Sequence, residues 1–298
     1  MPMQSYPEIA RQMVEDMARI ASAEPERAIA YQGAPGAYSH IAARAFAPDC
    51  HPLPCFSFQD AMDAVKDGRA ARAIIPIENS QHGRVADIHF LLPESGLTIV
   101  AEYFLPVRHC LLAKGEGPYT AAVSHPQALG QTRHYLRAHG LEPINYPDTA
   151  GAAAFVAESS EPGLCAVASQ LAGEVFGLKV VEQGIEDAAH NMTRFVVLAA
   201  HRDDSMPDVS KVMTTFIFEV KNIPAALFMA LSGFATNGIN MTKLESYIRD
   251  GSFAAAEFYA DIEGMPGQPA VDRALEVLGY HSKWVRILGS YPQAMSRE

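Results

Sequence analysis

Short apolar runs alternate with helix-like segments along residues 27 to about 200. RAIAYQG (27–33), ARAIIPIENS (71–80) and GLCAVASQ (163–170) are typical of buried strands, and SHIAARAFA (39–47) is typical of the helices between them. Strands that alternate with helices favour a mainly parallel sheet with helices on its faces. This part of the chain is therefore predicted to be an α/β domain.

A long extended stretch, LTIVAEYFLPVRHCLLAKG (97–115), separates two groups of strands and helices. We interpret this stretch as a crossover between two lobes of one domain. Ligands of α/β sheets bind where strands end and helices begin. A ligand cleft is therefore predicted between the lobes.

The pattern changes after HRDDSMPDVS (201–210), a polar segment with a proline that is predicted to be a linker. Beyond it we expect a strand, a helix, two strands paired around the turn Asp250-Gly251, a second helix and a last strand. This βαββαβ order is the ferredoxin-like plan. We predict an N-terminal helical extension over 1–26, a two-lobed domain over 27–207 and an α+β domain over 208–298.

Composition narrows the class of protein. The 298 residues carry a net charge of −11, which argues against nucleic acid as a partner. No apolar run approaches the roughly 20 residues that span a bilayer, and the first 26 residues lack the layout of a signal peptide. The four cysteines show no zinc-binding spacing and fit a reducing compartment. We expect a cytoplasmic protein without metal, cofactor or membrane contact.

The candidate chemistry lies in four loops at predicted strand or helix ends: GAPGAYSH (33–40), IENSQHG (77–83), SHPQALGQ (124–131) and HNMTRF (190–195). The first is a glycine-rich turn in which Ser39 is expected to cap a helix. Together the loops offer amides, hydroxyls and one arginine. No Ser-His-Asp order, H-E-x-x-H motif or P-loop is present. Such groups suit holding an anion and donating a proton.

These stretches resemble prephenate dehydratase, which makes phenylpyruvate on the route to phenylalanine. The resemblance rests on GAPGAYSHIAARAF, IPIENSQHG, VSHPQALGQ, TAGAAAFVA, AVASQLAGEVFGL and HNMTRFVVLA, which follow one another in the order found in that family. It implies a two-lobed catalytic domain like that of periplasmic binding proteins, prephenate as substrate and a C-terminal ACT regulatory domain.

The resemblance also implies roles for individual residues. The catalytic group is expected to comprise Thr193, Arg194, Phe195, Glu78 and Asn79. The substrate-binding group is expected to comprise Ser39, Ser80, Ser124, Gln131 and Asn191. Thr193 is the expected donor to the departing hydroxyl, and Glu78 is the alternative acid if burial raises its pKa.

The C-terminal domain departs from the family pattern at two motifs. The family's G-A-L reads Ala225-Ala226-Leu227 here, and E-S-R-P reads Glu245-Ser246-Tyr247-Ile248, whereas Asn240, Thr242 and Glu245 still match. Phenylalanine is the expected effector. An altered affinity, another effector, or a domain that serves only for dimerisation stay open. The family resemblance favours a homodimer or homotetramer.

Two other functions remain as alternatives. The first is an arogenate dehydratase, whose substrate has an amino acid side chain in place of the pyruvyl group. The second is a non-catalytic cytosolic sensor of small anions or amino acids. The 26-residue N-terminal segment is too short for a chorismate mutase domain.

Overall fold

The structure is a computed structural model that describes residues 6–85, 87–201, 211–247 and 257–296. The chain forms two compact units. The first contains residues 1–84 and 103–195, and the second contains residues 85–102 and 196–298. The units are described one after the other.

The first sheet has the strand order β2-β1-β3-β11-β5, with β4 paired to β3. β1 pairs in parallel with both β2 and β3, as the α/β prediction requires. Two helices, α2 and α3, pack on β1 and β3. The strands are β1 (Ala28–Gln32), β2 (His51–Cys55), β3 (Arg72–Asn79), β4 (Gly83–Arg84), β5 (Thr98–Pro106) and β11 (Met192–Ala199), and the helices are α2 (Tyr38–Phe46) and α3 (Phe58–Lys66). We call β1, β2, β3, α2 and α3 the first lobe.

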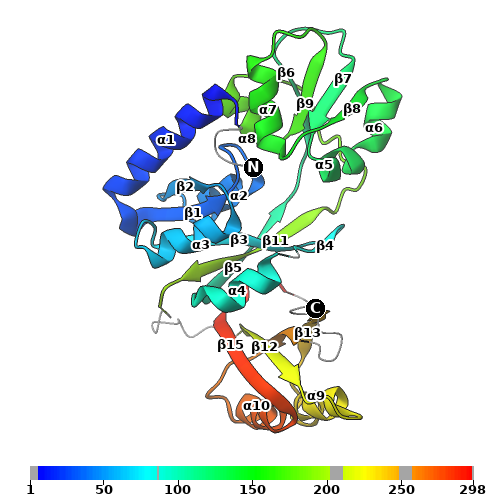
Figure 1. Ribbon diagram of the computed structural model, residues 1–298. Coiled ribbons are helices and arrows are strands. Elements are labelled where there is room, and N and C mark those ends of the chain that lie inside the picture. Colours follow the sequence, from blue (N-terminus) through cyan, green and yellow to red (C-terminus); the bar gives the residue numbers. More distant parts are fainter. Residues whose placement is uncertain (1–5, 86, 202–210, 248–256, 297–298) are drawn as a thin grey trace. The chain divides into compact units, whose positions relative to one another are not determined.

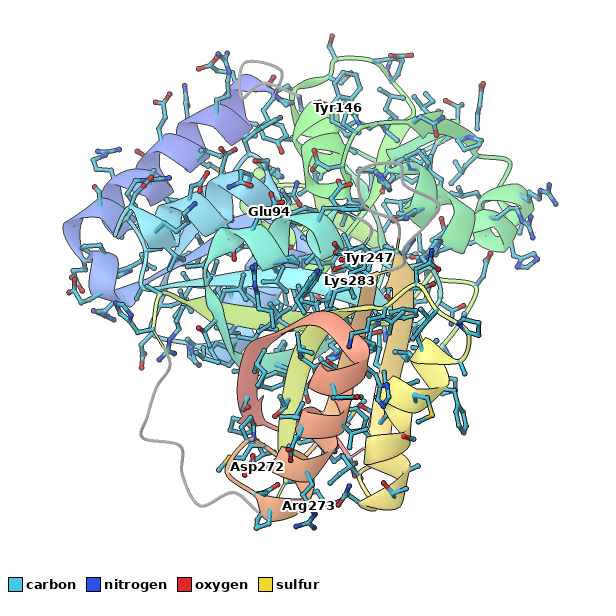
Figure 2. The ribbon with its side chains drawn as sticks, turned by 60° about the horizontal axis from the view of Figure 1, so that its bottom comes forward. Glu94, Tyr146, Tyr247, Asp272, Arg273 and Lys283 are labelled. Carbon is cyan, nitrogen blue, oxygen red and sulfur yellow. The ribbon has the colours of Figure 1, made fainter. Side chains whose placement is uncertain are left out.

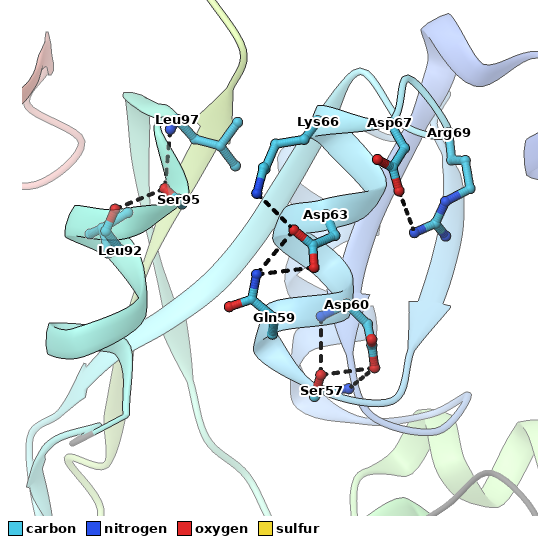
Figure 3. Close-up of polar contacts among 10 residues, drawn as sticks. All are labelled: Ser57, Gln59, Asp60, Asp63, Lys66, Asp67, Arg69, Leu92, Ser95 and Leu97. Atoms are coloured by element: carbon cyan, nitrogen blue, oxygen red, sulfur yellow. Dashed lines mark hydrogen bonds and ion pairs between the residues drawn. The ribbon is translucent and has the colours of Figure 1, made fainter.

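The start of α3 is set by a reciprocal cap (Figure 3). The Ser57 hydroxyl accepts a hydrogen bond from the Asp60 backbone N–H at 3.0 Å, and the Ser57 backbone N–H donates to the Asp60 carboxylate at 3.0 Å. Two donors that the first turn leaves unpaired are thereby satisfied. The cap therefore fixes Ser57 as the residue at which the β2–α3 connection ends and α3 begins.

The second sheet has the order β10-β6-β9-β7-β8. Its strands are β6 (Cys110–Ala113), β7 (Ala121–Ser124), β8 (Glu142–Asn145), β9 (Leu164–Ala168) and β10 (Lys179–Gln183). β7 is parallel to β8 and β9, whereas β6 runs antiparallel to β9 and to β10. The sheet is therefore mixed rather than mainly parallel, because the crossover stretch enters as β6 in the reversed direction. The helices are α5 (Pro126–Gln131), α6 (Arg133–Ala138), α7 (Thr149–Glu158) and α8 (Gln170–Phe176), and with this sheet they form the second lobe.

The N-terminal segment folds into helix α1 (Glu8–Ala23), followed by a short 3-10 turn (Pro25–Arg27). α1 contacts both β2 of the first lobe and α7 of the second (Figure 1). Ala10 is fully buried in the core of the second lobe, and the Ile9 backbone N–H donates to the Glu158 carboxylate at 2.6 Å. The helix is therefore packed on the body of the protein.

The glycine-rich turn of the first lobe docks on the start of α8 in the second. Gly36 has a φ of +89°, and a Cβ at this position would lie 2.6 Å from the Ala172 Cα. The Ser169 hydroxyl donates to the Gly36 carbonyl at 2.6 Å. Only glycine satisfies both the backbone conformation and the close approach.

The second unit contains a four-stranded antiparallel sheet of order β13-β14-β12-β15. Its elements are β12 (Val212–Val220), α9 (Ala226–Thr236), β13 (Met241–Tyr247), β14 (Glu257–Glu263), α10 (Pro269–His281) and β15 (Ser282–Pro292). This is the βαββαβ order expected from the sequence. The two helices pack together (Figures 1 and 2), and the Arg273 guanidinium donates to the Asn237 side chain at 2.8 Å. The expected turn Asp250-Gly251 and all of the expected linker after His201 lie outside the described residues.

Helix α4 (Ile88–Ser95), which was predicted to lie in the 27–207 domain, packs within the second unit. The buried His89 ring lies 2.9 Å from the Glu245 carboxylate of β13 and edge-on to Tyr247 and Tyr259. The His89 contact, ahead of the charge of Lys243, lowers the pKa of Glu245 to about 2. A segment that follows the IENSQHG loop thus contacts the strand of the altered regulatory motif.

Replacement of Gly36 by alanine is expected to destabilise the protein more than the same change at Gly68. Both glycines have positive φ, but a Cβ at Gly68 would meet open space. We expect a cost of about 1 kcal/mol for Gly68→Ala from backbone strain alone and roughly 3 kcal/mol for Gly36→Ala. Urea denaturation of both variants measures the difference. Equal costs would contradict the close approach to Ala172.

The stability of the first lobe is expected to fall below about pH 6.5 because of His40. Its buried ring stacks on Tyr31 and accepts a hydrogen bond from the Gly36 backbone N–H at 3.0 Å. Burial, with a smaller effect of Arg44, lowers the pKa of His40 from 6.5 to about 4. The unfolded chain therefore binds a proton between these values that the folded chain does not, which removes roughly 3 kcal/mol as the pH falls from 6.5 to 4.

Denaturation at pH 7, 5.5 and 4.5 tests this pH dependence. His40→Asn keeps an acceptor for the Gly36 N–H and is expected to flatten the profile, whereas His139→Asn, at an exposed histidine, should leave it unchanged. A wild-type profile that His40→Asn does not alter would assign the acid sensitivity to other groups.

Candidate active site

The Asn79 side chain joins the end of β3 to the start of β11. Its amide nitrogen donates to the Asn191 side-chain oxygen at 2.8 Å and to the Thr193 hydroxyl oxygen at 2.9 Å. Its carbonyl oxygen accepts from the backbone N–H groups of Gln81 and His82 at 3.0 and 3.1 Å. One amide therefore shapes the loop after β3 and orients two side chains of the next strand.

Two hydrogen-bond donors remain at this cluster. Because the Thr193 oxygen accepts from Asn79, its own proton is left to donate, and no acceptor for that proton lies within the described part of the chain. The Asn191 amide is 4% exposed, and its nitrogen has no hydrogen-bond partner among the described residues. A buried amide nitrogen without a partner marks a position at which a ligand oxygen would be stabilised.

Glu78 and Arg194 pair on the opposite face of the strands. Successive residues of a strand alternate between faces, so Arg194 points away from the Thr193 side. Its guanidinium is 2% exposed and donates to the Glu78 carboxylate at 3.0 Å. Phe195, on the same face as Thr193, is 1% exposed and lies in the core. The T-R-F triplet thus separates its hydroxyl from its guanidinium.

The predicted serine sites make mainly structural contacts. The Ser80 hydroxyl donates to the His190 carbonyl at 3.0 Å, and the buried Ser124 hydroxyl donates to the Val167 carbonyl at 2.5 Å. The expectation that Ser39 caps α2 is wrong. The turn at Gly36 starts the helix early, so that Ala37 is the N-cap residue and Ser39 lies buried within the first turn.

Gln131 makes a hydrogen-bonded contact between the two lobes. Its oxygen lies 2.6 Å from His109 Nε2, and its nitrogen lies 2.9 Å from Nδ1 of His82, in the loop after β3. His109 Nδ1 in turn lies 2.7 Å from the Tyr38 hydroxyl. Burial lowers the pKa of His109. The chain of contacts Tyr38–His109–Gln131–His82 therefore runs from α2 to the Asn79 loop.

The second lobe adds a carboxyl and an imidazole near the start of α5. His125 is the N-cap of α5, and Asp148 caps α7 by accepting from the Gly151 backbone N–H at 2.6 Å. Burial raises the pKa of Asp148, and burial lowers the pKa of His125 despite the nearby Asp148 charge. Pro126 follows as the first residue of α5, where its missing N–H costs no hydrogen bond.

Other sites of the molecule are less suited to this chemistry. A pocket of about 300 Å³ lies at the amino-terminal ends of β1 and β3, lined by Arg27, Asp49, Cys50 and Arg72 among others, away from the motif loops. Among the described residues, no cluster of His, Cys, Asp and Glu is arranged to hold a metal ion, and no helix is long and apolar enough to cross a membrane.

Three residues of this region were not selected from the sequence: Tyr38, His82 and His109. Tyr38 and His82 stand inside the quoted motifs GAPGAYSH and IENSQHG, and His109 immediately precedes β6 in the crossover stretch. The signal that could have identified these residues in the sequence was an aromatic ring with a polar atom near the end of a motif loop. The pairing through Gln131 is non-local and is visible only in the fold.

Comparisons with known proteins agree with the motif order. Residues 29–203 match the family model described as prephenate dehydratase. A bifunctional N-acyl-homoserine lactone acylase/prephenate dehydratase of Komagataeibacter europaeus is 46% identical over 91% of this chain and 98% of its own. Arogenate dehydratase/prephenate dehydratase 6 of Arabidopsis thaliana is 38% identical over 90% of this chain and 69% of its own.

A solved structure has the same fold. Prephenate dehydratase of Arthrobacter aurescens, in complex with L-Phe, superposes with a TM-score of 0.80 over 90% of both chains at 27% identity. The family model covers more than half of this chain, and the match to the Komagataeibacter protein extends over nearly its whole length. The chain belongs to the prephenate dehydratase family.

Proposed function

We propose that this chain converts prephenate into phenylpyruvate, CO2 and water. The observation that carries the proposal is the 2.9 Å hydrogen bond from the Asn79 amide to the Thr193 oxygen. It leaves the hydroxyl proton of Thr193 to donate, and the nitrogen of Asn191, whose oxygen accepts from the same Asn79 amide, has no partner among the described residues. Two such donors suit a reaction in which negative charge develops on a departing oxygen.

The reaction needs little covalent chemistry from the protein. The substrate is a dianion whose ring carries a carboxylate and a pyruvyl arm, with a hydroxyl across the ring. Loss of the carboxylate as CO2 supplies the electron pair, the C–O bond to the hydroxyl breaks, and the ring becomes aromatic. The hydroxide that leaves takes a proton from solvent and becomes water. The protein must therefore orient the dianion and stabilise the hydroxide that leaves.

Thr193 and Asn191 are proposed to stabilise that hydroxide. A threonine hydroxyl is a poor acid, so Thr193 donates a hydrogen bond to the developing charge rather than transferring its proton. Glu78, the alternative acid, accepts from Arg194 on the other face of the strand. We assign Glu78 the role of holding the buried guanidinium.

Thr193→Ala is expected to lower kcat by roughly 100- to 1000-fold with little change in KM, because the lost hydrogen bond acts mainly in the transition state. Thr193→Ser keeps the hydroxyl and should retain most of the activity. Thr236→Val, in α9, is the matched control. The measurement is steady-state turnover of prephenate, and near-normal kcat in Thr193→Ala would remove this residue from the mechanism.

The substrate preference is tested in the same assay with arogenate. The names of relatives in this family include both activities. Turnover of prephenate supports the proposal, and turnover of arogenate alone would change the substrate. Absence of turnover with either would favour the non-catalytic sensor.

The acylase activity in the name of the Komagataeibacter relative is not included in the proposal. Covalent amide hydrolysis requires a nucleophile with an adjacent base. Across the described ranges, no serine, threonine or cysteine side chain is hydrogen-bonded to a histidine ring. Neutral donors of the kind found around Asn79 serve the dehydratase reaction better.

We also propose that the βαββαβ unit is an ACT domain that responds to phenylalanine. The A. aurescens relative was solved with L-Phe. In the altered motif of this chain, the backbone at the position of the family's glycine still has a glycine-like φ angle. Ala225 has a φ of +60°, and no other non-glycine residue in the described ranges has a positive φ. The backbone thus keeps the conformation that a glycine adopts without strain.

Ala225→Gly is expected to stabilise the second unit by about 1 kcal/mol through relief of this strain, whereas Ala226→Gly, one residue into the helix, should cost about 1 kcal/mol. Fluorescence of the single tryptophan, Trp284 of β15, follows unfolding in urea.

Phenylalanine should inhibit the wild type and should inhibit Ala225→Gly at lower concentration. No effect of phenylalanine on either would reduce the unit to a scaffold.

A homo-oligomer is proposed as well. Phe228 of α9 and Tyr280 of α10 are each 73% exposed, and Ile287 of β15 is 43% exposed. Large apolar side chains gathered on one small unit are typical of an interface. Light scattering of the purified protein measures the mass in solution.

A further inference from the structure

We propose that His82 is a substrate-binding residue, which donates from Nε2 to a carboxylate of the bound dianion. This inference rests on the proposed function and concerns the same site. It is carried by the position of the ring in the loop after β3 and by the contact that Gln131 makes with Nδ1.

His82 and the Thr193 hydroxyl are connected through a single residue, Asn79. The His82 backbone N–H donates to the Asn79 side-chain oxygen at 3.1 Å, and the nitrogen of the same amide donates to Thr193. A small molecule that contacts Thr193 therefore lies beside a loop whose exposed side chains include the imidazole of His82.

Gln131 determines which ring nitrogen faces outward. As its amide is oriented, the nitrogen donates to His82 Nδ1 at 2.9 Å and the oxygen accepts from His109 Nε2 at 2.6 Å. In this orientation Nε2 of His109 is the donor, and its Nδ1 lies 2.7 Å from the Tyr38 hydroxyl, which also donates to the Arg108 carbonyl at 2.8 Å. The Gln131 nitrogen, at 2.9 Å, is nearer to His82 Nδ1 than the Asn79 side-chain oxygen, at 3.4 Å, so we take Nδ1 as the acceptor and Nε2 as the nitrogen that carries the proton. Nε2 has no hydrogen-bond partner in the described ranges of the chain.

The charge of the substrate calls for such a donor. Prephenate carries two carboxylates, and the guanidinium of Arg194 is 2% exposed and already bonded to Glu78. His82 instead is exposed, and it contacts the second lobe through Gln131. An N–H group of His82, held at the contact with Gln131, therefore offers a substrate carboxylate a hydrogen-bond donor from the first lobe.

Two substitutions separate the two nitrogens of the ring. An asparagine amide reaches the position of Nδ1 and can still meet Gln131, but it offers nothing at Nε2. A glutamine amide reaches the position of Nε2 and gives up the contact with Gln131. We expect His82→Asn to raise KM for prephenate about tenfold or more with kcat within about threefold, and His82→Gln to keep KM within about threefold. His134→Asn, at an exposed histidine paired with Asp187, is the surface control and should match the wild type.

The opposite order, in which His82→Asn is normal and His82→Gln is impaired, would show that the ring only braces Gln131 and would overturn the inference. Normal KM in both variants would overturn it too. Wild-type protein without turnover would refute the proposed function, and calorimetric titration with prephenate would then compare the same variants. Weaker binding in His82→Asn alone would support the contact, and equal binding or no binding to the wild type would reject it.

Discussion

The geometry of the site depends on the side-chain amide of Asn79. Its oxygen accepts from two backbone N–H groups of the loop after β3, and its nitrogen donates to two side chains at the start of β11. A primary amide is the natural group for this position because it offers acceptor and donor at fixed separation and does not titrate. The direction of the Thr193 proton is therefore set by a contact that is independent of pH.

The neutral character of the site follows from where the charges are placed. The one arginine of the motif loops is buried against Glu78, an arrangement in which each charge compensates the desolvation of the other. Burial also lowers the pKa of His109, which disfavours its charged form. What remains toward the Asn79 side is a set of O–H and N–H donors. Such a set suits the stabilisation of a leaving oxygen that we propose for this site.

Much of this arrangement was accessible from the sequence, because local patterns encode it. The alternating segments, the βαββαβ order and the motif loops at strand ends are each fixed by neighbours within about ten residues. The antiparallel entry of β6, the packing of α4 beside β13 and the Gln131–His82 contact join residues far apart in the chain. The separation of Thr193 from Arg194 follows from the sequence, since adjacent residues of a strand face opposite sides. The family triplet, in which the two residues are adjacent, does not by itself indicate this separation.

Helix α1 and the Gly36 turn restrict how the two lobes can move relative to each other. α1 contacts β2 and α7, and Gly36 fits against Ala172, so both lobes are held together along this side. On the side that bears Gln131, side-chain contacts join the lobes: Gln131 to His82, and Gln131 through His109 to Tyr38. A rotation of one lobe that preserves the contacts of α1 and Gly36 would therefore break the contact between Gln131 and His82 and open the lobes at that edge.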